Sequence, residues 1–424
     1  AMTRVFGVDS VSPVEHECEN NLEAMKKTIV EHYSEKVAGK TFAVRVKRNG
    51  VKGFSSLQAE QEVGGCLRPF AKSVDLKNPE FQVNIEVNQY GALFFSNRIK
   101  GPGGLPLGTQ GKALCMISGG FDSAVAAWEM MKRGVALDYI FCNLAGSSYE
   151  RSVLAVVKGL TSQWAYGTSP KVHISDFQPV VAAIDEHVRP QYAQMILKRM
   201  FYRVSNKVAD YENKSNYLAL VTGEAIGQVS SQTLKNLAAI DCVSDRLIIR
   251  PLITTDKQVI IDQARKIGTH LLCEHIQEYC SLSKAKPVTG ASISSVDHFE
   301  SDLPDNIVAE TSKSTKSVKI LDLTHQELVT QYLYTDEIKE DAILIDCRTK
   351  EEYKTWHYPG ALFLDLSHLI AAYKSLDKSK TYVLYCAHGL QTAVAAELMQ
   401  KQGFNSYSFE GGVKGLMKYH KLKK

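Results

Sequence analysis

The chain has 424 residues, of which 44% are hydrophobic and 23% are charged, and its formal net charge is only +4. This length exceeds one ordinary core, so the composition predicts a globular protein of two to four domains. No stretch reaches the roughly eighteen uncharged apolar residues of a membrane helix, and no charged-then-apolar leader opens the chain. The sequence therefore predicts a cytoplasmic protein without a membrane partner.

Nine cysteines are scattered along the chain, with no Cys-x-x-Cys pair and no regular spacing. This arrangement argues against a disulfide scaffold and against a zinc site. Cys115 and Cys142 lie inside apolar strand patterns and are interpreted as small core residues.

The first hundred residues or so predict a small α/β module. Residues 3–13 are strand-like but have no evident partner, and residues 21–37 have the apolar spacing of a helix, which Gly39 ends. Residues 41–48 and 81–87 alternate apolar and polar side chains, which predicts two half-buried strands. Six basic residues occur between positions 36 and 59 without an acidic one: Lys36, Lys40, Arg45, Lys47, Arg48 and Lys52. Such a patch can offset nucleic-acid phosphates, although a charge run is often only a solvated face.

A connector rich in glycine and proline, residues 101–108, precedes a long alternation of strands and helices. Strands are predicted at 113–117, 137–143, 171–176, 217–223 and 247–251, and helices at 124–133, 153–164, 180–188 and 195–210. This order predicts an open parallel sheet with helices on both faces, which binds ligands at the carboxyl ends of its strands.

A glycine turn joins the first of these strands to its helix, in the order Ser118, Gly119, Gly120, Phe121, Asp122, Ser123. Adjacent glycines let the backbone approach an anion, and the N–H groups that begin a helix favour phosphate. The turn lacks both the lysine-bearing nucleotide motif and the dinucleotide fingerprint. It resembles the loop of PP-loop ATP pyrophosphatases, which split ATP into AMP and pyrophosphate. The alternative is a plain strand-turn-helix corner with Asp122 or Ser123 as its N-cap.

Two further segments predict parts of the same cleft. Residues 220–224 end a strand in a glycine turn, and residues 227–233 follow as a small polar segment. Lys198 lies on an otherwise apolar helix, from which its charge could reach a triphosphate. The alternative for Lys198 is a surface lysine with its stem on apolar neighbours.

Together, the loop at 118–123, Leu-Lys-Arg-Met at 197–200 and the run at 221–233 resemble the tRNA 4-thiouridine synthetase family in its long form, which carries a carboxyl-terminal rhodanese domain. That family is also linked to thiamine thiazole synthesis. The resemblance implies ATP as cofactor, with Asp122 helping to hold Mg²⁺ as a hard oxygen ligand. The residues that match the family's nucleotide site are Met116, Ile117, Ser118, Gly119, Gly120, Phe121, Asp122, Ser123, Phe141, Cys142, Lys198, Gly223 and Gln232.

The amino-terminal module, through residues 39–48, resembles a THUMP domain, a tRNA-binding module. The resemblance implies RNA contacts at Lys40, Arg45, Lys47, Arg48 and Lys52. Because the family carries a ferredoxin-like module before its THUMP domain, residues 1–12 are interpreted as the tail of that module.

Residues 289–317 are dense in serine, threonine, aspartate and lysine, which predicts a flexible linker. Beyond it, buried strands at 342–346 and 382–385 predict a final α/β domain. Cys386 ends the second of these strands before a short loop and a helix at 393–402, where loop N–H groups and the helix terminus stabilise a thiolate and His388 could add positive charge. The alternative is an inert buried cysteine.

Segments 346–353, 357–361 and 409–413 resemble the landmarks of a rhodanese domain, which makes Cys386 a persulfide carrier. The loop after Cys386 has no arginine, which disfavours thiosulfate as donor and favours a cysteine desulfurase. Cys280 matches the family's second redox cysteine, the disulfide partner of Cys386.

The sequence thus predicts an α/β multidomain enzyme, a tRNA uridine 4-sulfurtransferase. Uridine O4 attacks the α-phosphate of ATP, and sulfur from Cys386 then displaces AMP, either directly or as sulfide released by attack of Cys280. Sulfur transfer to a carrier protein for thiamine synthesis is compatible with this role. Alternatives are a PP-loop synthetase that uses nitrogen and a non-catalytic tRNA-binding protein. The predicted parts are a ferredoxin-like tail (1–12), a THUMP domain (13–106), a PP-loop ATP pyrophosphatase domain (107–285), a flexible linker (286–330) and a rhodanese-like domain (331–424).

Overall fold

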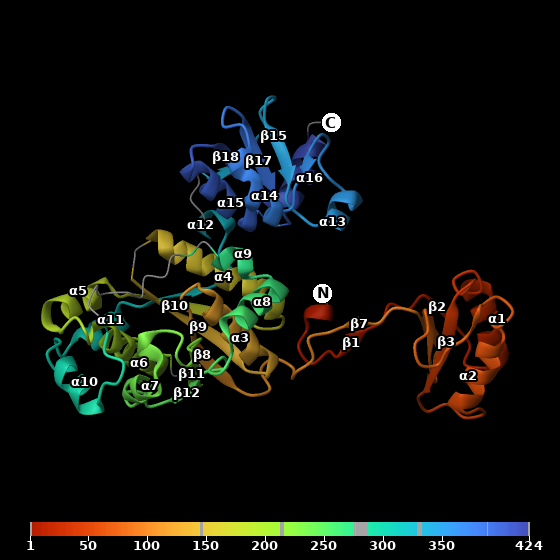
Figure 1. The fold of residues 1–424 in the computed structure, drawn as a ribbon, viewed down its shortest axis with the longest axis horizontal. Helices are drawn as coiled ribbons and strands as arrows, with labels where there is room; N and C mark the ends of the chain where they lie inside the picture. The colour runs from red at the N-terminus through yellow and green to blue at the C-terminus, as the bar shows by residue number, and fades with distance from the viewer. Residues whose placement is uncertain are drawn as a thin grey trace. The chain divides into compact units, whose positions relative to one another are not determined.

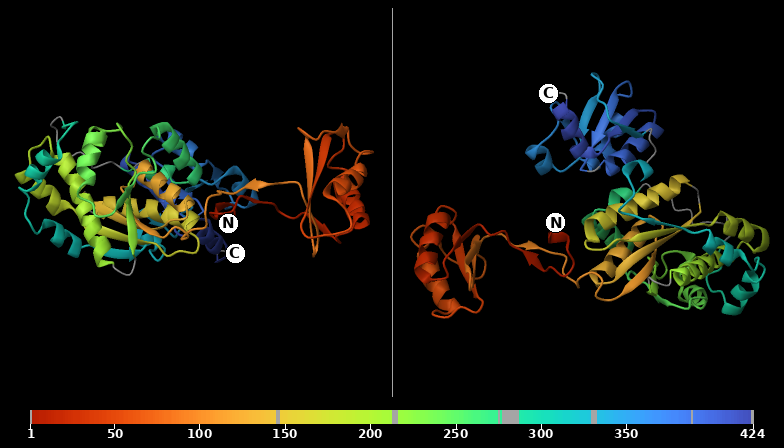
Figure 2. Two further views of the ribbon diagram at one scale, coloured as in Figure 1. Left: turned by 90° about the horizontal axis from the view of Figure 1, so that it is seen from below. Right: turned by 180° about the vertical axis from the view of Figure 1, so that it is seen from behind.

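The computed structural model describes residues 2–144, 147–212, 216–274, 276, 287–328, 333–387 and 389–422. The chain divides into two compact units, Ala1–Gly104 and Leu105–Lys424. Figure 1 labels the elements of both units, and Figure 2 shows them from two further sides. Within the described part of the chain, no helix is both long and apolar enough to cross a membrane.

In the first unit, two helices pack on a five-stranded sheet of order β2-β6-β5-β3-β4. The strands β3 and β5 pair in parallel, and their inward residues form one core with both helices. Side chains cap both helix starts, because Asn21 accepts from the Ala24 N–H and Ser55 from the Gln58 N–H. The predicted strand at 41–48 is confirmed. The elements are β2 (His16–Cys18), α1 (Leu22–Tyr33), β3 (Thr41–Arg48), α2 (Ser56–Gly65), β4 (Ser73–Val74), β5 (Phe81–Asn88) and β6 (Gly91–Phe95).

The beginning of the chain, η1 (Met2–Arg4) and β1 (Ser10–Val11), has a partner that its sequence did not reveal. The strand β1 pairs antiparallel with β7 (Ile99–Lys100), and the Gly101 N–H donates to the Asp9 carbonyl at 2.7 Å. Two strands of two residues each, far apart in sequence, leave no pattern that would predict their pairing.

The second unit contains the predicted open sheet, with strand order β12-β11-β8-β9-β10-β13. The first five strands are parallel, and β13 is antiparallel to β10. Helices α5, α6 and α7 contribute to the core on one face, and α3, α4 and α9 to that on the other (Figure 1). The elements are β8 (Lys112–Met116), α3 (Phe121–Lys132), β9 (Ala136–Asn143), α4 (Ser147–Trp164), β10 (Lys171–Asp176), α5 (Gln178–His187), α6 (Ala193–Tyr211), β11 (Tyr217–Val221), η3 (Ser230–Gln232), α7 (Leu234–Asp241), β12 (Leu247–Ile249), α8 (Lys257–Ile267) and α9 (His270–Cys273).

The prediction of a flexible linker at 286–330 is wrong for those residues of the segment that the structure describes. They form α10 (Ile293–Glu300), α11 (Ile307–Lys313), β13 (Lys316–Lys319) and α12 (His325–Leu328). The few apolar side chains of this segment, such as Val296 and Leu303, are buried in the same core as α6. Because β13 is a largely exposed edge strand, three of its four side chains are polar even though the segment is a strand.

The last α/β domain has five parallel strands of order β14-β18-β17-β15-β16. Apolar clusters lie on both faces of this sheet, one with α14 and α15 and the other with α16. Its elements are β14 (Tyr334–Thr335), β15 (Ile343–Asp346), α13 (Lys350–Thr355), β16 (Leu362–Phe363), α14 (Leu366–Ala372), η5 (Tyr373–Ser375), β17 (Thr381–Tyr385), α15 (Leu390–Lys401), β18 (Asn405–Phe409) and α16 (Gly412–Leu422).

Candidate active site

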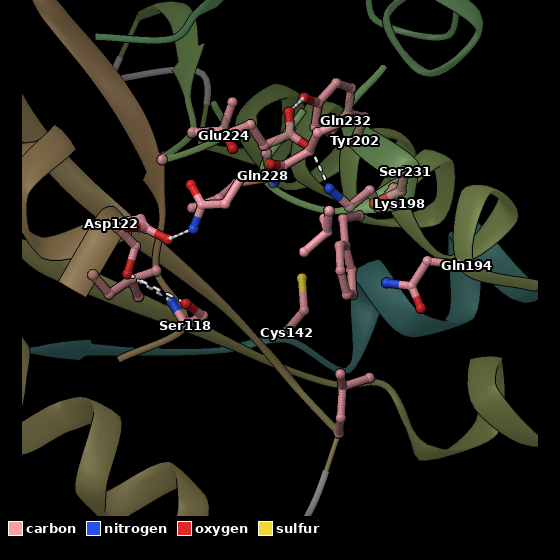
Figure 3. Close-up of a pocket in the computed structure, with 18 of the residues that line it drawn as sticks. Ser118, Asp122, Cys142, Gln194, Lys198, Tyr202, Glu224, Gln228, Ser231 and Gln232 are labelled. Carbon is pink, nitrogen blue, oxygen red and sulfur yellow. Dashed lines mark hydrogen bonds and ion pairs between the residues drawn. The ribbon is translucent and has the colours of Figure 1, made fainter. Parts of the chain in front are cut away.

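A cavity of about 420 Å³ opens where β8, β9 and β11 end, at the carboxyl edge of the six-stranded sheet (Figure 3). The strand order reverses here, because β9 lies on one side of β8 and β11 on the other. Open parallel sheets bind their ligands at such a reversal. Of the predicted nucleotide residues, those that line the cavity are Met116, Ile117, Ser118, Asp122, Ser123, Cys142, Lys198, Gly223 and Gln232.

The other predicted nucleotide residues support the cavity without lining it. Gly119 has φ +81°, and a Cβ there would come within 2.7 Å of Ile276. Gly120 is the N-cap of α3. Phe121 packs on His270 with 5.2 Å between the ring centroids, and Phe141 packs on Tyr149 at 5.0 Å.

Hydrogen bonds within the glycine turn hold its shape. The Ser123 hydroxyl donates to the Gly120 carbonyl at 3.1 Å, and the Ser118 N–H donates to Ser123 Oγ at 3.3 Å. No side chain caps α3, whose first turn faces the cavity through Asp122 and Ser123. This geometry suits an anion, because the N–H groups of a helix start point toward it.

Gly223 allows the loop after β11 to approach this turn closely. A Cβ at Gly223 would lie 2.6 Å from the Asp122 carbonyl carbon and 2.7 Å from the Ser123 nitrogen. Both contacts are with backbone that a larger residue would have to displace.

Both oxygens of the Asp122 carboxylate accept hydrogen bonds from neighbouring side chains. Lys257 Nζ, on the first residue of α8, lies 2.8 Å and 2.9 Å from them, and the Gln228 amide donates at 2.9 Å. Lys257 therefore places a positive charge beside the glycine turn. Among the residues that the structure describes, no group of three His, Cys, Asp or Glu side chains could hold a metal ion.

Lys198 is not a surface lysine, because its side chain is 12% exposed and forms an ion pair with Glu224 at 2.5 Å. Glu224 also accepts from the Tyr202 hydroxyl at 2.9 Å and from Arg250 Nε at 3.0 Å. Arg250 in turn forms a bidentate pair with Asp241. A buried, charge-balanced network thus fixes the Lys198 ammonium at the cavity wall (Figure 3).

The protonation states in this network follow from its charges. Burial alone would raise the pKa of Glu224, but the charges of Lys198 and Arg250 hold this pKa below its ordinary value. Burial and the Glu224 charge raise the pKa of Tyr202, so its hydroxyl remains a donor. The carboxylate stays ionised and Lys198 keeps its counter-ion.

Part of the cavity lining is apolar. It can receive a planar ring, and the Tyr149 hydroxyl donates from it to the Ser118 carbonyl at 2.9 Å. Its lining residues are Met116, Ile140, Cys142, Leu144, Tyr149 and Phe201, with the amide of Gln194 beside them.

Sequence reasoning missed several of the described residues around the cavity, among them Tyr149, Gln194, Tyr202, Arg250 and Lys257. Arg250 follows β12 directly, so the strand-end rule offered a signal for it. Lys257 begins a helix far along the chain, and its ion pair with Asp122 exists only in the folded structure.

Two hydrogen-bond donors of the described residues contact the Cys386 sulfur. Cys386 follows β17, and the Gly389 N–H lies 3.2 Å and the Thr392 hydroxyl 3.6 Å from its Sγ. Gly389 has φ +82° and is the N-cap of α15. Donors aimed at sulfur stabilise a thiolate. The predicted residues Cys280 and His388 lie outside the described residues.

The five basic residues predicted to contact RNA lie in the first unit. Lys40, Lys47 and Lys52 are exposed, whereas Arg45 and Arg48 are half-buried. The two guanidinium groups donate to the carbonyls of Leu76 and Val51, at 2.5 Å and 2.7 Å. The three lysines therefore supply the accessible charge.

Three family descriptions match separate stretches of the chain. "Thiamine biosynthesis protein (ThiI)" matches residues 108–304, "THUMP domain" residues 19–96 and "Rhodanese-like domain" residues 330–418.

Whole-chain comparisons point the same way. The chain is 38% identical to a tRNA sulfurtransferase of Desulfurococcus amylolyticus, over 97% of this chain and 85% of that protein. It is also 38% identical to a tRNA sulfurtransferase of Pyrobaculum aerophilum, over 96% of this chain and 84% of that protein. A solved structure, described as a 4-thiouridine synthetase in complex with RNA and with bound ATP, matches with a TM-score of 0.66 at 30% identity. The match covers 74% of this chain and 84% of that one.

Proposed function

Because the chain belongs to the ThiI family of tRNA sulfurtransferases, we propose that it uses ATP to make 4-thiouridine in tRNA. One observation carries the proposal: the cavity joins a phosphate-type glycine turn, a buried lysine and an apolar wall at one sheet edge. The turn suits the phosphates of ATP, and the apolar wall suits a planar base.

In the first step, uridine O4 attacks the α-phosphate of ATP, which gives an adenylated base and releases pyrophosphate. The first turn of α3 would receive the phosphates, while Lys198 at the cavity wall and Lys257 beside Asp122 would supply positive charge. Asp122 would hold Mg²⁺, an ion that protein sites bind through one or two carboxylates plus substrate phosphates and that would offset the charge of the leaving pyrophosphate. One carboxylate beside a phosphate loop fits that requirement if Mg²⁺ takes the place of the Lys257 ammonium, which contacts both Asp122 oxygens in this structure.

In the second step, the outer sulfur of a Cys386 persulfide attacks C4 of the base and displaces AMP. The Cys280 thiolate then attacks Sγ of Cys386, and the S–S bond breaks with its electron pair on the sulfur at C4, which gives 4-thiouridine and a Cys280–Cys386 disulfide that a reductant must reopen. The Gly389 N–H and the Thr392 hydroxyl would stabilise the Cys386 thiolate that this reduction restores. A cysteine desulfurase is the proposed sulfur donor, and Cys280 is also the proposed disulfide partner in the route through released sulfide. The same persulfide would serve a sulfur carrier protein for thiamine synthesis, and the lysines of the first unit would hold the tRNA.

The test is incorporation of labelled sulfur into unmodified tRNA with ATP, magnesium and a cysteine desulfurase. The unmodified chain is expected to thiolate tRNA over many turnovers, whereas Cys386→Ser and Asp122→Ala are expected to lose this activity. Pyrophosphate release separates the two variants, because Cys386→Ser should still adenylate. Sustained thiolation by Cys386→Ser would contradict the persulfide role. Pyrophosphate release without sulfur transfer by any form would favour a synthetase of another kind.

A further inference from the structure

A second cysteine lies beside Cys386 in the same sheet. The parallel strands β15 and β17 are neighbours (Figure 1). Their register pairs Asp346 with Tyr385. The next residue on each strand is a cysteine, Cys347 and Cys386. The Cys347 N–H donates to the Tyr385 carbonyl at 2.9 Å, so the register continues to the two cysteines.

The two side chains share a face and a distance that suits a disulfide. Side chains alternate along a strand, and Cys347 lies in the same apolar cluster as Ile345 and Leu384. Neighbouring strands are about 4.7 to 4.9 Å apart, within the roughly 4.4 to 6.8 Å between Cα atoms that a disulfide spans. Both cysteines lie one residue beyond their strands.

Both thiols are free and buried, with 5% of Cys347 and 3% of Cys386 exposed. Burial raises the pKa of the Cys347 thiol, and negative charge at Cys386, Asp346 and Asp365 raises it further. Cys347 therefore stays protonated at rest, which keeps its attack on a neighbouring sulfur slow.

We propose that Cys347 is a resolving thiol for Cys386 that acts within the last domain, an inference that rests on the proposed persulfide. The Cys347 sulfur loses its proton and attacks Sγ of Cys386. The bond between this Sγ and the outer sulfur breaks, and the outer sulfur leaves as hydrogen sulfide with the electron pair and a proton. The two cysteines are oxidised to a disulfide, the outer sulfur is reduced to sulfide, and a dithiol reductant restores both thiols.

Through this reaction the Cys386 persulfide can lose its outer sulfur without the participation of Cys280. When no acceptor base is present, the Cys386 persulfide decays to sulfide and a Cys347–Cys386 disulfide. The chain then returns to its reduced state without passing sulfur to RNA.

The experiment uses the full chain carrying Cys280→Ser, so that Cys280 cannot interfere. The protein is loaded with cysteine and a cysteine desulfurase, separated from both, and sampled over time by peptide mass spectrometry and a sulfide assay. Early samples should carry one extra sulfur on the Cys386 peptide. Later samples should contain the Cys347–Cys386 linked peptide and an equal amount of released sulfide.

Adding Cys347→Ala, which keeps the site apolar, should preserve the persulfide, abolish the linked peptide and slow sulfide release on the order of tenfold. Cys242→Ser, which removes an exposed cysteine of the nucleotide domain, is the matched control and should change neither result. Oxidation of the Cys280→Ser chain by diamide should link the same two peptides without any persulfide.

Three outcomes would overturn the inference. A stable persulfide with no linked peptide, and with sulfide release unchanged by Cys347→Ala, refutes it and leaves the proposed function standing. Failure of diamide to link the two cysteines refutes the proximity on which it depends. Absence of any persulfide on Cys386 refutes both the inference and the persulfide role.

Discussion

At the scale of single residues, the buried carboxylate of Glu224 balances two cations at the cavity wall. Its exposed fraction is 7%, and it contacts Lys198, Tyr202 and Arg250. Glu224→Gln leaves Lys198 without a counter-ion, whereas Arg250 keeps Asp241. Removal of one partner from a buried pair costs about 3 to 5 kcal/mol. We therefore expect a loss of roughly 3 kcal/mol in the free energy of unfolding, measured with urea.

The control for this prediction is Tyr202→Phe, which removes the hydrogen bond to the same carboxylate and the one that the hydroxyl accepts from Arg250, and which should cost about 2 kcal/mol. Both variants also test function, because a misplaced Lys198 should raise KM for ATP in pyrophosphate release. If the Glu224→Gln protein were as stable as Tyr202→Phe, the charge of Glu224 would make no net contribution to the free energy of unfolding.

At the scale of elements, the sequence correctly predicted the strands and the turn whose positions follow from local periodicity. The strands at 41–48 and 171–176 have the predicted bounds, and the glycine turn lies between β8 and α3 as expected. The segment 289–317 was mispredicted because its apolar residues are few, although they reach the core. Lys257 and the pairing of β1 with β7 were missed because contacts between distant segments leave no local pattern.

Contacts between elements also make the stability of the first unit depend on pH. Glu15 precedes β2 and accepts from the Ser96 N–H at 2.8 Å, from the hydroxyl of Tyr33, the last residue of α1, and from Lys36 beyond that helix. Burial alone would raise the pKa of Glu15, but the Ser96 and Lys36 contacts lower it from 4.5 to about 2. A lowered folded-state pKa stabilises the fold above the unfolded-state pKa, and this contribution is lost as the pH falls toward 2.

We therefore expect the free energy of unfolding to decrease as the pH is lowered from 4.5 to about 2. Protonation of Glu15 should cause a definite amount of that decrease. Once solvent screening is allowed for, this amount is about 1 to 2 kcal/mol. The measurement is denaturant unfolding of this unit across the pH range, compared with Glu15→Gln. The variant should be less stable at pH 6 and should lose less stability in acid. Parallel curves for the two proteins would exclude Glu15 as the group responsible.

At the scale of the whole molecule, the THUMP match and the candidate nucleotide cavity lie in different compact units. The accessible lysines of the predicted THUMP surface are in the first unit, and the cavity with its ion pairs is in the second. Neither the Asp122–Lys257 pair nor the Lys198–Glu224 pair draws on a residue of the first unit. Changes to the lysine surface should therefore leave adenylation chemistry intact while they weaken the capture of tRNA.

The variant that tests this separation combines Lys40→Ala, Lys47→Ala and Lys52→Ala. Each lysine that contacts a phosphate contributes about one unit to the slope of log affinity against log salt. The triple variant should lower that slope by up to about three and raise KM for tRNA, with ATP affinity unchanged. The matched control replaces three exposed lysines of the last domain, Lys354, Lys374 and Lys380, and so removes the same net charge elsewhere. If both triple variants weaken tRNA binding equally, net charge rather than the predicted surface governs binding, and the assignment of the first unit to RNA would be wrong.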